Sequence, residues 1–280
     1  MNFCTKQVVL ALSCVVFLAG CSAASDETAE QPESSATLPN PSEAASSSTP
    51  EASSSTPTSS APTSAPTSAT PKPTNSGFDY SAESTTDPAS YWVVVNKARP
   101  LDPADYAATD LVEVPVAHVY TPILRQAASD AVVEMFADFA DETGLAMQSQ
   151  SAYRSYSSQK SVYAGWVSSL GKDGADLTSA RAGYSEHQTG LAIDISAKPS
   201  KCALDQCFAD TPQGEWLAKN AWKYGFILRF PDGYTDVTGY EFEPWHYRYV
   251  GVELAKEYHD TGATTLEEFF GMDAAPDYLN

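Results

Sequence analysis

The sequence predicts an α+β fold in which helices pack on an antiparallel-rich sheet. Segments with helical spacing and short strand-like segments follow one another without the regular strand–helix alternation that a doubly wound parallel sheet requires. Residues 78–280 hold every Trp, Tyr and Phe except Phe3 and Phe17, and their number suits one compact domain. We therefore expect a single domain of this class over residues 78–280.

The helices of this domain are predicted from the spacing of apolar residues and from the glycines that follow them. Between Thr121 and Thr143 apolar residues recur three and four positions apart, and Gly144 comes next. This spacing assigns the segment to the core. The other predicted helices cover 157–170, 215–224 and a short capping stretch after His259, to which we assign no role.

Strand-like segments lie between these helices. The predicted strands or extended segments are 91–96, 145–153, 190–195, 226–230 and 243–250. Successive side chains of a strand point to opposite faces, so Ala192 and Asp194 share one face of the sheet. The segment 145–153 delivers Arg154 at its end, and 243–250 closes the sheet.

The first 20 residues are typical of a secretory signal. They contain no acidic residue, one Lys at position 6, and an apolar run from Val8 to Ala19 that is too short to span a bilayer. The stretch from Leu18 to Cys21 resembles a bacterial lipobox, in which the cysteine is lipidated and becomes the first residue of the mature protein. The prediction is a lipoprotein anchored to the bacterial membrane; the alternatives are secretion after cleavage and an uncleaved anchor.

Residues 21–77 are predicted to be a disordered linker. They consist mainly of Ser, Thr, Pro, Ala and Glu, and no aromatic residue occurs in them. At about 3.1 Å per residue a proline-rich chain of this length reaches at most on the order of 170 Å. Such a linker would carry the domain from the membrane into the cell wall.

The charge and the cysteines restrict the partners and the compartment. A formal net charge of -20 argues against nucleic acid and against electrostatic attachment to anionic lipids, and we predict no protein partner. Cys4 and Cys14 leave with the signal and Cys21 takes the lipid, which leaves Cys202 and Cys207 in an exported domain. We predict a local disulfide between these two; thiolate metal ligands and unpaired thiols are the alternatives.

Two stretches concentrate the residues that suit catalysis. Residues 185–194 read Ser-Glu-His-Gln-Thr-Gly-Leu-Ala-Ile-Asp, and residues 243–247 read Glu-Pro-Trp-His-Tyr. The chain has four histidines, and one lies in each stretch. Together they offer two imidazoles, one ligating carboxylate and one spare carboxylate, which is the inventory of a catalytic zinc site with an open fourth position.

Each residue of this set has an expected role. His187, Asp194 and His246 are the expected zinc ligands, and Glu243 is the expected general base that moves a proton from water to the departing amine. Residues three apart on a regular strand face opposite sides, so Glu243 and His246 require a bend, for which Pro244 is the candidate. The alternative is that the histidines are ordinary hydrogen-bonded residues and Asp194 belongs to a turn.

The two stretches resemble the SxHxxGxAxD and ExWH signatures of the VanY-type zinc D-Ala-D-Ala carboxypeptidase family, which shares its fold with the amino-terminal signalling domain of hedgehog proteins. Residues 151–159 resemble a third family segment, S-x-Y-R-S-x-x-x-Q. The resemblance implies one Zn²⁺ per domain. It also implies that Arg154 faces the metal and stabilises the oxyanion or holds substrate, while Gln159 and Ser185 contact the peptide. A structural salt bridge is the alternative for Arg154.

The resemblance implies a membrane-tethered metallocarboxypeptidase that removes the terminal D-alanine of peptidoglycan stem peptides. Relatives with these motifs include L,D-carboxypeptidases that act on tetrapeptide stems, so L,D-cleavage is the main alternative, and endopeptidase action on cross-links is a third. A non-catalytic module that binds cell-wall peptides is the alternative from another class. Such a module is expected to lack the base, whereas this chain has Glu243.

Overall fold

The computed structural model of the chain describes residues 77–279. The predicted signal 1–20, Cys21 and the predicted linker up to residue 76 lie outside the described residues. Over the range that is described, none of the helices has the length and apolar character needed to cross a membrane.

A four-stranded sheet organises the fold, and every pair of neighbouring strands in it is antiparallel. Its strands lie in the order β3-β4-β6-β5. Their bounds are β3 Ala146–Ser151, β4 Ala192–Lys198, β6 His246–Tyr249 and β5 Phe226–Leu228. A separate antiparallel pair consists of β1 Leu111–Glu113 and β2 Ile123–Arg125. The predicted α+β class with an antiparallel sheet is confirmed.

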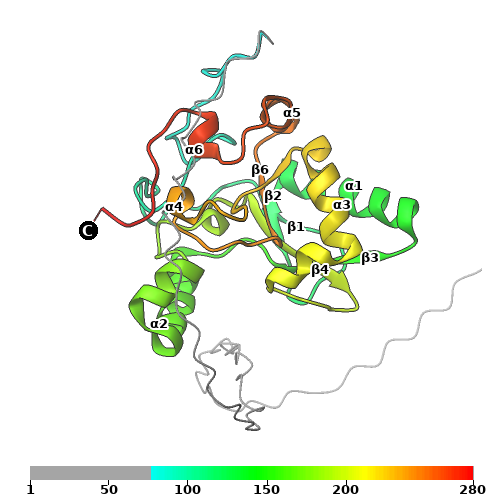
Figure 1. The fold of residues 1–280 in the computed structure, drawn as a ribbon, viewed down its shortest axis with the longest axis horizontal. Coiled ribbons are helices and arrows are strands. Elements are labelled where there is room, and N and C mark those ends of the chain that lie inside the picture. Colours follow the sequence, from blue (N-terminus) through cyan, green and yellow to red (C-terminus); the bar gives the residue numbers. More distant parts are fainter. Residues whose placement is uncertain (1–76, 280) are drawn as a thin grey trace, which may run out of the picture. The chain divides into compact units, whose positions relative to one another are not determined.

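Helices pack on this sheet and at its ends. The α-helices are α1 Gln126–Thr143, α2 Tyr156–Thr178, α3 Pro212–Asn220, α4 Thr235–Thr238, α5 Val252–Thr261 and α6 Leu266–Phe269. The 3-10 turns are η1 Glu186–Thr189, η2 Gln206–Asp210 and η3 Ala221–Tyr224. Figure 1 shows α1 and α3 together on one side of the sheet, with α2 at the opposite end of the domain.

The main core lies between the sheet and α1 with α3. Val132, Met135 and Phe139 of α1 are fully buried, as the helical spacing predicts, and Leu124 of β2 is buried beside them. They meet alternate residues of the strands, such as Ile193 and Ile195 of β4 and Tyr247 of β6. Because the intervening residues point the other way, the polar side chains of β4 and β6 share the face that is turned away from α1.

Some predicted elements differ from the structure. The helix predicted from Thr121 begins only at Gln126, because residues 123–125 pair with β1 instead. The predicted helix 157–170 continues as α2 to Thr178, although Gly171 at φ 73° interrupts its helical geometry as a terminating glycine would. The capping helix expected after His259 is α6, and α5 before it was not predicted.

Residues 92–96 are buried, but the segment 91–96 is not a strand of a sheet and begins in a turn. The Arg248 guanidinium donates to the carbonyl oxygens of Tyr91 and Val93, at 3.0 and 2.8 Å. A side chain thus occupies acceptors that a neighbouring strand would otherwise use, and the segment packs in a second apolar cluster with α5 and α6.

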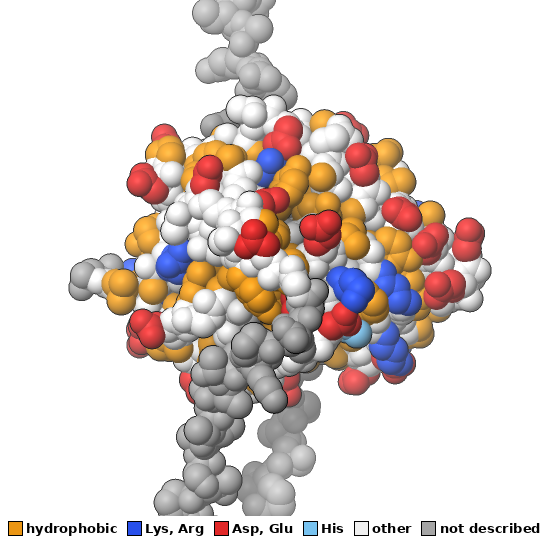
Figure 2. All heavy atoms as spheres, turned by 90° about the horizontal axis from the view of Figure 1, so that it is seen from above, with side chains coloured by type: hydrophobic (Ala, Val, Ile, Leu, Met, Phe, Trp, Pro, Cys, Tyr) orange, Lys and Arg blue, Asp and Glu red, His pale blue; other side chains and the backbone are white. Residues whose placement is uncertain are grey.

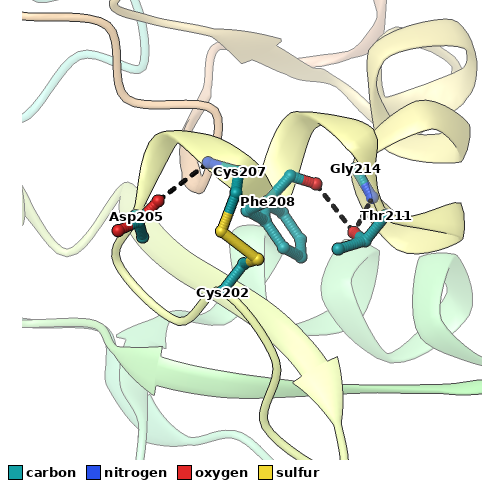
Figure 3. The surroundings of a disulfide bond; sticks show 6 residues. All are labelled: Cys202, Asp205, Cys207, Phe208, Thr211 and Gly214. Carbon is teal, nitrogen blue, oxygen red and sulfur yellow. Dashed lines mark hydrogen bonds between the residues drawn. A yellow bond between two sulfur atoms is a disulfide. The ribbon is translucent and has the colours of Figure 1, made fainter.

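A disulfide joins Cys202 and Cys207 in the loop between β4 and α3, with 5.5 Å between their Cα atoms (Figure 3). Asp205 accepts a hydrogen bond from the backbone N–H of Cys207, and Thr211 caps α3 by accepting from Gly214. The loop is therefore closed by a covalent bond and by two capping side chains.

Acidic side chains are spread over the face drawn in Figure 2, in line with the negative net charge.

Candidate metal centre

The pairing of β4 with β6 brings two predicted ligands together. Asp194 lies directly opposite His246 in the register of these strands. Both side chains point to the face that is turned away from α1, and both residues are at most 4 % exposed. The Asp194 Oδ1 atom lies 3.1 Å from His246 Nδ1.

The third predicted ligand arrives from the turn before β4. His187 belongs to η1, which ends at Gly190 in the left-handed conformation with φ 70°. A side chain at Gly190 would be strained there and would clash with Leu111, so glycine permits the turn. His187 Nε2 lies 3.2 Å from Asp194 Oδ2. The potential ligand atoms of His187, Asp194 and His246 all lie within 4.8 Å of one another.

Hydrogen bonds orient both imidazole rings toward this centre. His187 Nδ1 lies 2.7 Å from the carbonyl oxygen of Ala152, to which it donates, and this leaves Nε2 free to bind a metal. His246 Nε2 lies 3.3 Å from Glu186 Oε2, which leaves Nδ1 facing Asp194. Two imidazole nitrogens and one carboxylate form a donor set that suits zinc, and they leave a fourth position open.

The surroundings control the protonation of these groups. Burial lowers the pKa of His187 and so favours its neutral, ligating form. For Asp194, burial by itself would raise the pKa, but His187 and His246 hold it well below its ordinary value. Burial also acts to lower the pKa of His246, yet its bonds to Asp194 and Glu186 raise it to about 9 when no metal is present. A bound cation would displace this proton.

Glu243 reaches the same centre through the predicted bend. The backbone N–H of His246 donates to the Glu243 carbonyl at 3.0 Å, which closes a turn before β6 begins. As a result, Glu243 Oε2 lies 3.7 Å from His246 Nδ1, although the two residues are three apart. Burial raises the pKa of Glu243 to about 8. A carboxyl with such a pKa is suited to take up and release a proton near neutral pH.

Arg154 lies beside the centre and is held by neutral groups. Its backbone N–H donates to the His187 carbonyl at 3.1 Å. Its guanidinium donates to Gln159 Oε1 at 2.7 Å and to Ser151 Oγ at 3.0 Å. Within residues 77–279 no carboxylate lies within salt-bridge distance of this guanidinium, so the positive charge remains available to a ligand.

Gln159 and Ser185 are both buried, at 0 % and 3 % exposure. The Gln159 amide nitrogen donates to Ser179 Oγ and to the Ala180 carbonyl, while its oxygen accepts from Arg154. Gln159 therefore orients Arg154. Contact between the substrate and either Gln159 or Ser185 stays a prediction.

Sequence reasoning missed the groups behind His246. Glu186, inside the first motif, accepts from Arg229 at 2.9 Å and from Arg248 at 2.8 Å in addition to His246. Burial alone would raise the pKa of Glu186, but Arg248 and Arg229 hold it well below its ordinary range. Alternation along β6 places Arg248 on the same face as His246, so the sequence could have indicated that Arg248 lies near the ligand. Nothing in the motif singled out Glu186.

Comparisons with known proteins place this chain in a family. The family model described as "VanY: D-alanyl-D-alanine carboxypeptidase" matches residues 121–252. The chain is 41% identical over 193 residues to "Putative carboxypeptidase YodJ" of Bacillus subtilis (strain 168), and the match covers 67% of this chain and 70% of that protein.

Two solved structures have related folds. The LdcB LD-carboxypeptidase has a TM-score of 0.61 at 40% identity, and the match covers 66% of this chain and 88% of that one. A vancomycin-resistance D,D-pentapeptidase VanY, in complex with Zn(II), has a TM-score of 0.52 at 29% identity, with 63% and 97% covered. The identity to YodJ and the matched family model show that this chain belongs to the VanY-type D-alanyl-D-alanine carboxypeptidase family.

Proposed function

We propose that this chain is a zinc-dependent carboxypeptidase that removes the terminal D-alanine of peptidoglycan stem peptides. The observation that carries the proposal is the convergence of His187, Asp194 and His246 on one buried centre, with Glu243 beside them. The solved VanY D,D-pentapeptidase was obtained with Zn(II), which supports zinc as the metal. When bound to these three residues, zinc supplies a Lewis acid that makes water more acidic and polarises the scissile carbonyl.

Glu243 is the proton carrier in the proposed reaction. Its Oε2 atom lies 3.7 Å from His246 Nδ1, and its raised pKa matches a group that gains and loses a proton during turnover. It would take a proton from the attacking water and deliver it to the amine of the departing D-alanine. This transfer balances the reaction, because water is split between the new carboxylate and the amine.

Arg154 supplies positive charge to the substrate. Attack on a peptide carbonyl develops negative charge on its oxygen, and the substrate also ends in a carboxylate. The Arg154 guanidinium keeps donors for either group, because in the described chain it bonds to Ser151 and Gln159 and pairs with no carboxylate. Gln159 and Ser151 hold the guanidinium in place before substrate binds, so that little reorganisation is needed.

Two bonds are candidates for cleavage. The family model and the VanY pentapeptidase favour the D-Ala-D-Ala bond of a pentapeptide stem. The second candidate is the L,D bond of a tetrapeptide stem. It is favoured by the LD-carboxypeptidase LdcB, which has the higher identity and TM-score of the two solved structures.

We further propose that the protein is anchored to the outer face of the bacterial membrane through a lipid on Cys21. The support is the sequence Leu-Ala-Gly-Cys at 18–21 together with the apolar run before it. Stable anchoring by lipid needs two or more acyl chains. The Ser-, Thr- and Pro-rich stretch after Cys21 would then let the domain reach the cell wall.

Replacing Asp194 with Asn is expected to weaken zinc binding by more than about 100-fold, because it removes the anionic ligand. Competition with a chromogenic chelator, starting from metal-stripped protein, measures the affinity. Asp141→Asn, an exposed site on α1, is the matched control. Equal zinc affinity in Asp194→Asn and in the unchanged protein would contradict the ligand assignment.

The zinc-loaded protein is expected to release one D-alanine from a pentapeptide stem ending in D-Ala-D-Ala, from a tetrapeptide stem, or from both, as followed by mass spectrometry. Glu243→Gln should lower kcat/KM by about 10²–10⁴-fold because the proton carrier is lost. Glu241→Gln, an exposed neighbour, should leave the rate unchanged.

Release from the pentapeptide alone assigns D,D-cleavage, and release from the tetrapeptide alone assigns L,D-cleavage. If neither peptide loses D-alanine while at least one binds to the zinc-loaded protein, the enzyme proposal fails and the binding module takes its place. Products cut inside a cross-link would instead indicate an endopeptidase.

Arg154→Lys is expected to lower kcat/KM by about 100-fold with zinc content unchanged, because an ammonium group cannot reproduce the planar donor set of the guanidinium. Steady-state kinetics on the cleaved stem peptide measure the effect. Arg99→Lys, whose guanidinium donates to the backbone carbonyls of Val94 and Thr85, is the control. An unchanged rate in Arg154→Lys would assign Arg154 a purely structural role.

Cys21→Ser is expected to move the protein from the membrane fraction to the soluble or secreted fraction, because the acceptor of the lipid is lost. Immunoblots of fractionated cells measure the distribution. Cys4→Ser, within the predicted signal, is the matched control. Membrane retention of the Cys21 variant would favour the uncleaved anchor.

A further inference from the structure

A line of buried side chains runs from His246 to the carboxyl-terminal part of the domain. His246 Nε2 lies 3.3 Å from Glu186 Oε2, and the other oxygen of Glu186 accepts from Arg229 Nε at 2.9 Å. Each terminal nitrogen of Arg229 then donates a hydrogen bond to one carboxylate oxygen of Glu267, at 3.0 and 2.7 Å. The metal centre is thereby connected to α6 through three consecutive side chains.

The charges of this line balance one another away from water. Glu186, Arg229, Arg248 and Glu267 have side-chain exposures of at most 2 %. Two carboxylates face two guanidiniums, so the group carries no net charge. A buried charge without its partner is strongly unfavourable, so each member depends on the others for its position.

Glu267 is fixed by more than its bond to Arg229. Asn96 donates its amide to Glu267 Oε1 at 2.9 Å. The neighbours Leu266 and Phe269 are buried in the second apolar cluster, which anchors α6 to the domain. Asn96 and Glu267 both lie outside residues 121–252, to which the family model matches.

We propose that Glu267 is a positioning residue for the metal ligand His246, acting through Arg229 and Glu186. The inference rests on the proposed function, since it concerns how the chain prepares its metal ligand. Glu267 occupies two donors of Arg229 and neutralises its charge. Glu186 can then use one oxygen for His246 Nε2–H, which holds the ring with Nδ1 toward the metal position.

Loss of the Glu267 charge would act on the metal centre in two ways. Arg229 would compete for both oxygens of Glu186 and so weaken the hydrogen bond that orients His246. The buried group would also carry one positive charge, which repels a divalent cation. Changes to groups that orient metal ligands typically lower metal affinity by about 10–100-fold.

The test is the zinc affinity of the full chain carrying Glu267→Gln, measured by chelator competition. We expect a loss of about 10-fold or more. Glu268→Gln is the matched control, because it removes the same charge from the next residue of α6, whose side chain is partly exposed. The ¹⁵N resonances of the His246 ring in the zinc-loaded protein should also change in Glu267→Gln and remain unchanged in the control.

A double variant separates positioning from general stability. Arg229→Gln combined with Glu267→Gln leaves one carboxylate and one guanidinium, so the group is neutral again. We expect the zinc affinity of the double variant to recover toward that of the unchanged protein. This measurement can be made even if Glu267→Gln alone fails to fold. A purely structural role predicts that the zinc affinities of the single and double variants follow the Tm values of their metal-free forms, and that Glu267→Gln binds zinc normally at temperatures where it is fully folded.

Three outcomes would overturn the inference, and they distinguish it from the proposed function. Equal zinc affinity in Glu267→Gln and in the unchanged protein, or a double variant that binds zinc no better than the single one, would overturn it alone. No zinc binding by the unchanged protein would overturn the proposed function, and the inference with it.

Discussion

The antiparallel pairing of β4 with β6 is the constraint on which the rest of this site depends. It places Asp194 opposite His246, while Ile193 and Tyr247 point into the core on the other face. A shift of the register by one residue would turn polar side chains into the core and remove Asp194 from His246. The packing of α1 against one face of the sheet therefore fixes the register that brings Asp194 and His246 together on the other face.

Several buried charges lie behind His246, and the structure compensates them by pairing. Glu186 receives hydrogen bonds from Arg229, Arg248 and His246, and Arg229 is shared with Glu267. Charges at these depths persist only with partners and hydrogen bonds. The groups that stabilise the fold behind His246 are thus the groups that orient the ring, so folding and ligand geometry are coupled.

Three short irregular segments complete the centre. The left-handed Gly190 lets η1 turn into β4, and the turn from Glu243 to His246 aims both side chains at one point. On the other side, a shift in strand register between Ser149 and Ser151 precedes Arg154, whose backbone is tied to His187. The side chains on these segments are held in place by the rigid sheet next to them.

The sequence by itself determined the class of the fold, the core face of α1, and the residue types of the metal centre. These features depend on local periodicity and on short motifs, which are readable in one dimension. The start of α1 at Gln126 could not be predicted, because pairing of residues 123–125 with β1 decides it. The hydrogen bonds from Arg248 to the segment 91–96 could not be predicted either, because they join residues far apart in the chain. Only the tertiary structure could join Glu186, Arg229 and Glu267, because these residues are far apart in the chain and only long-range packing makes them neighbours.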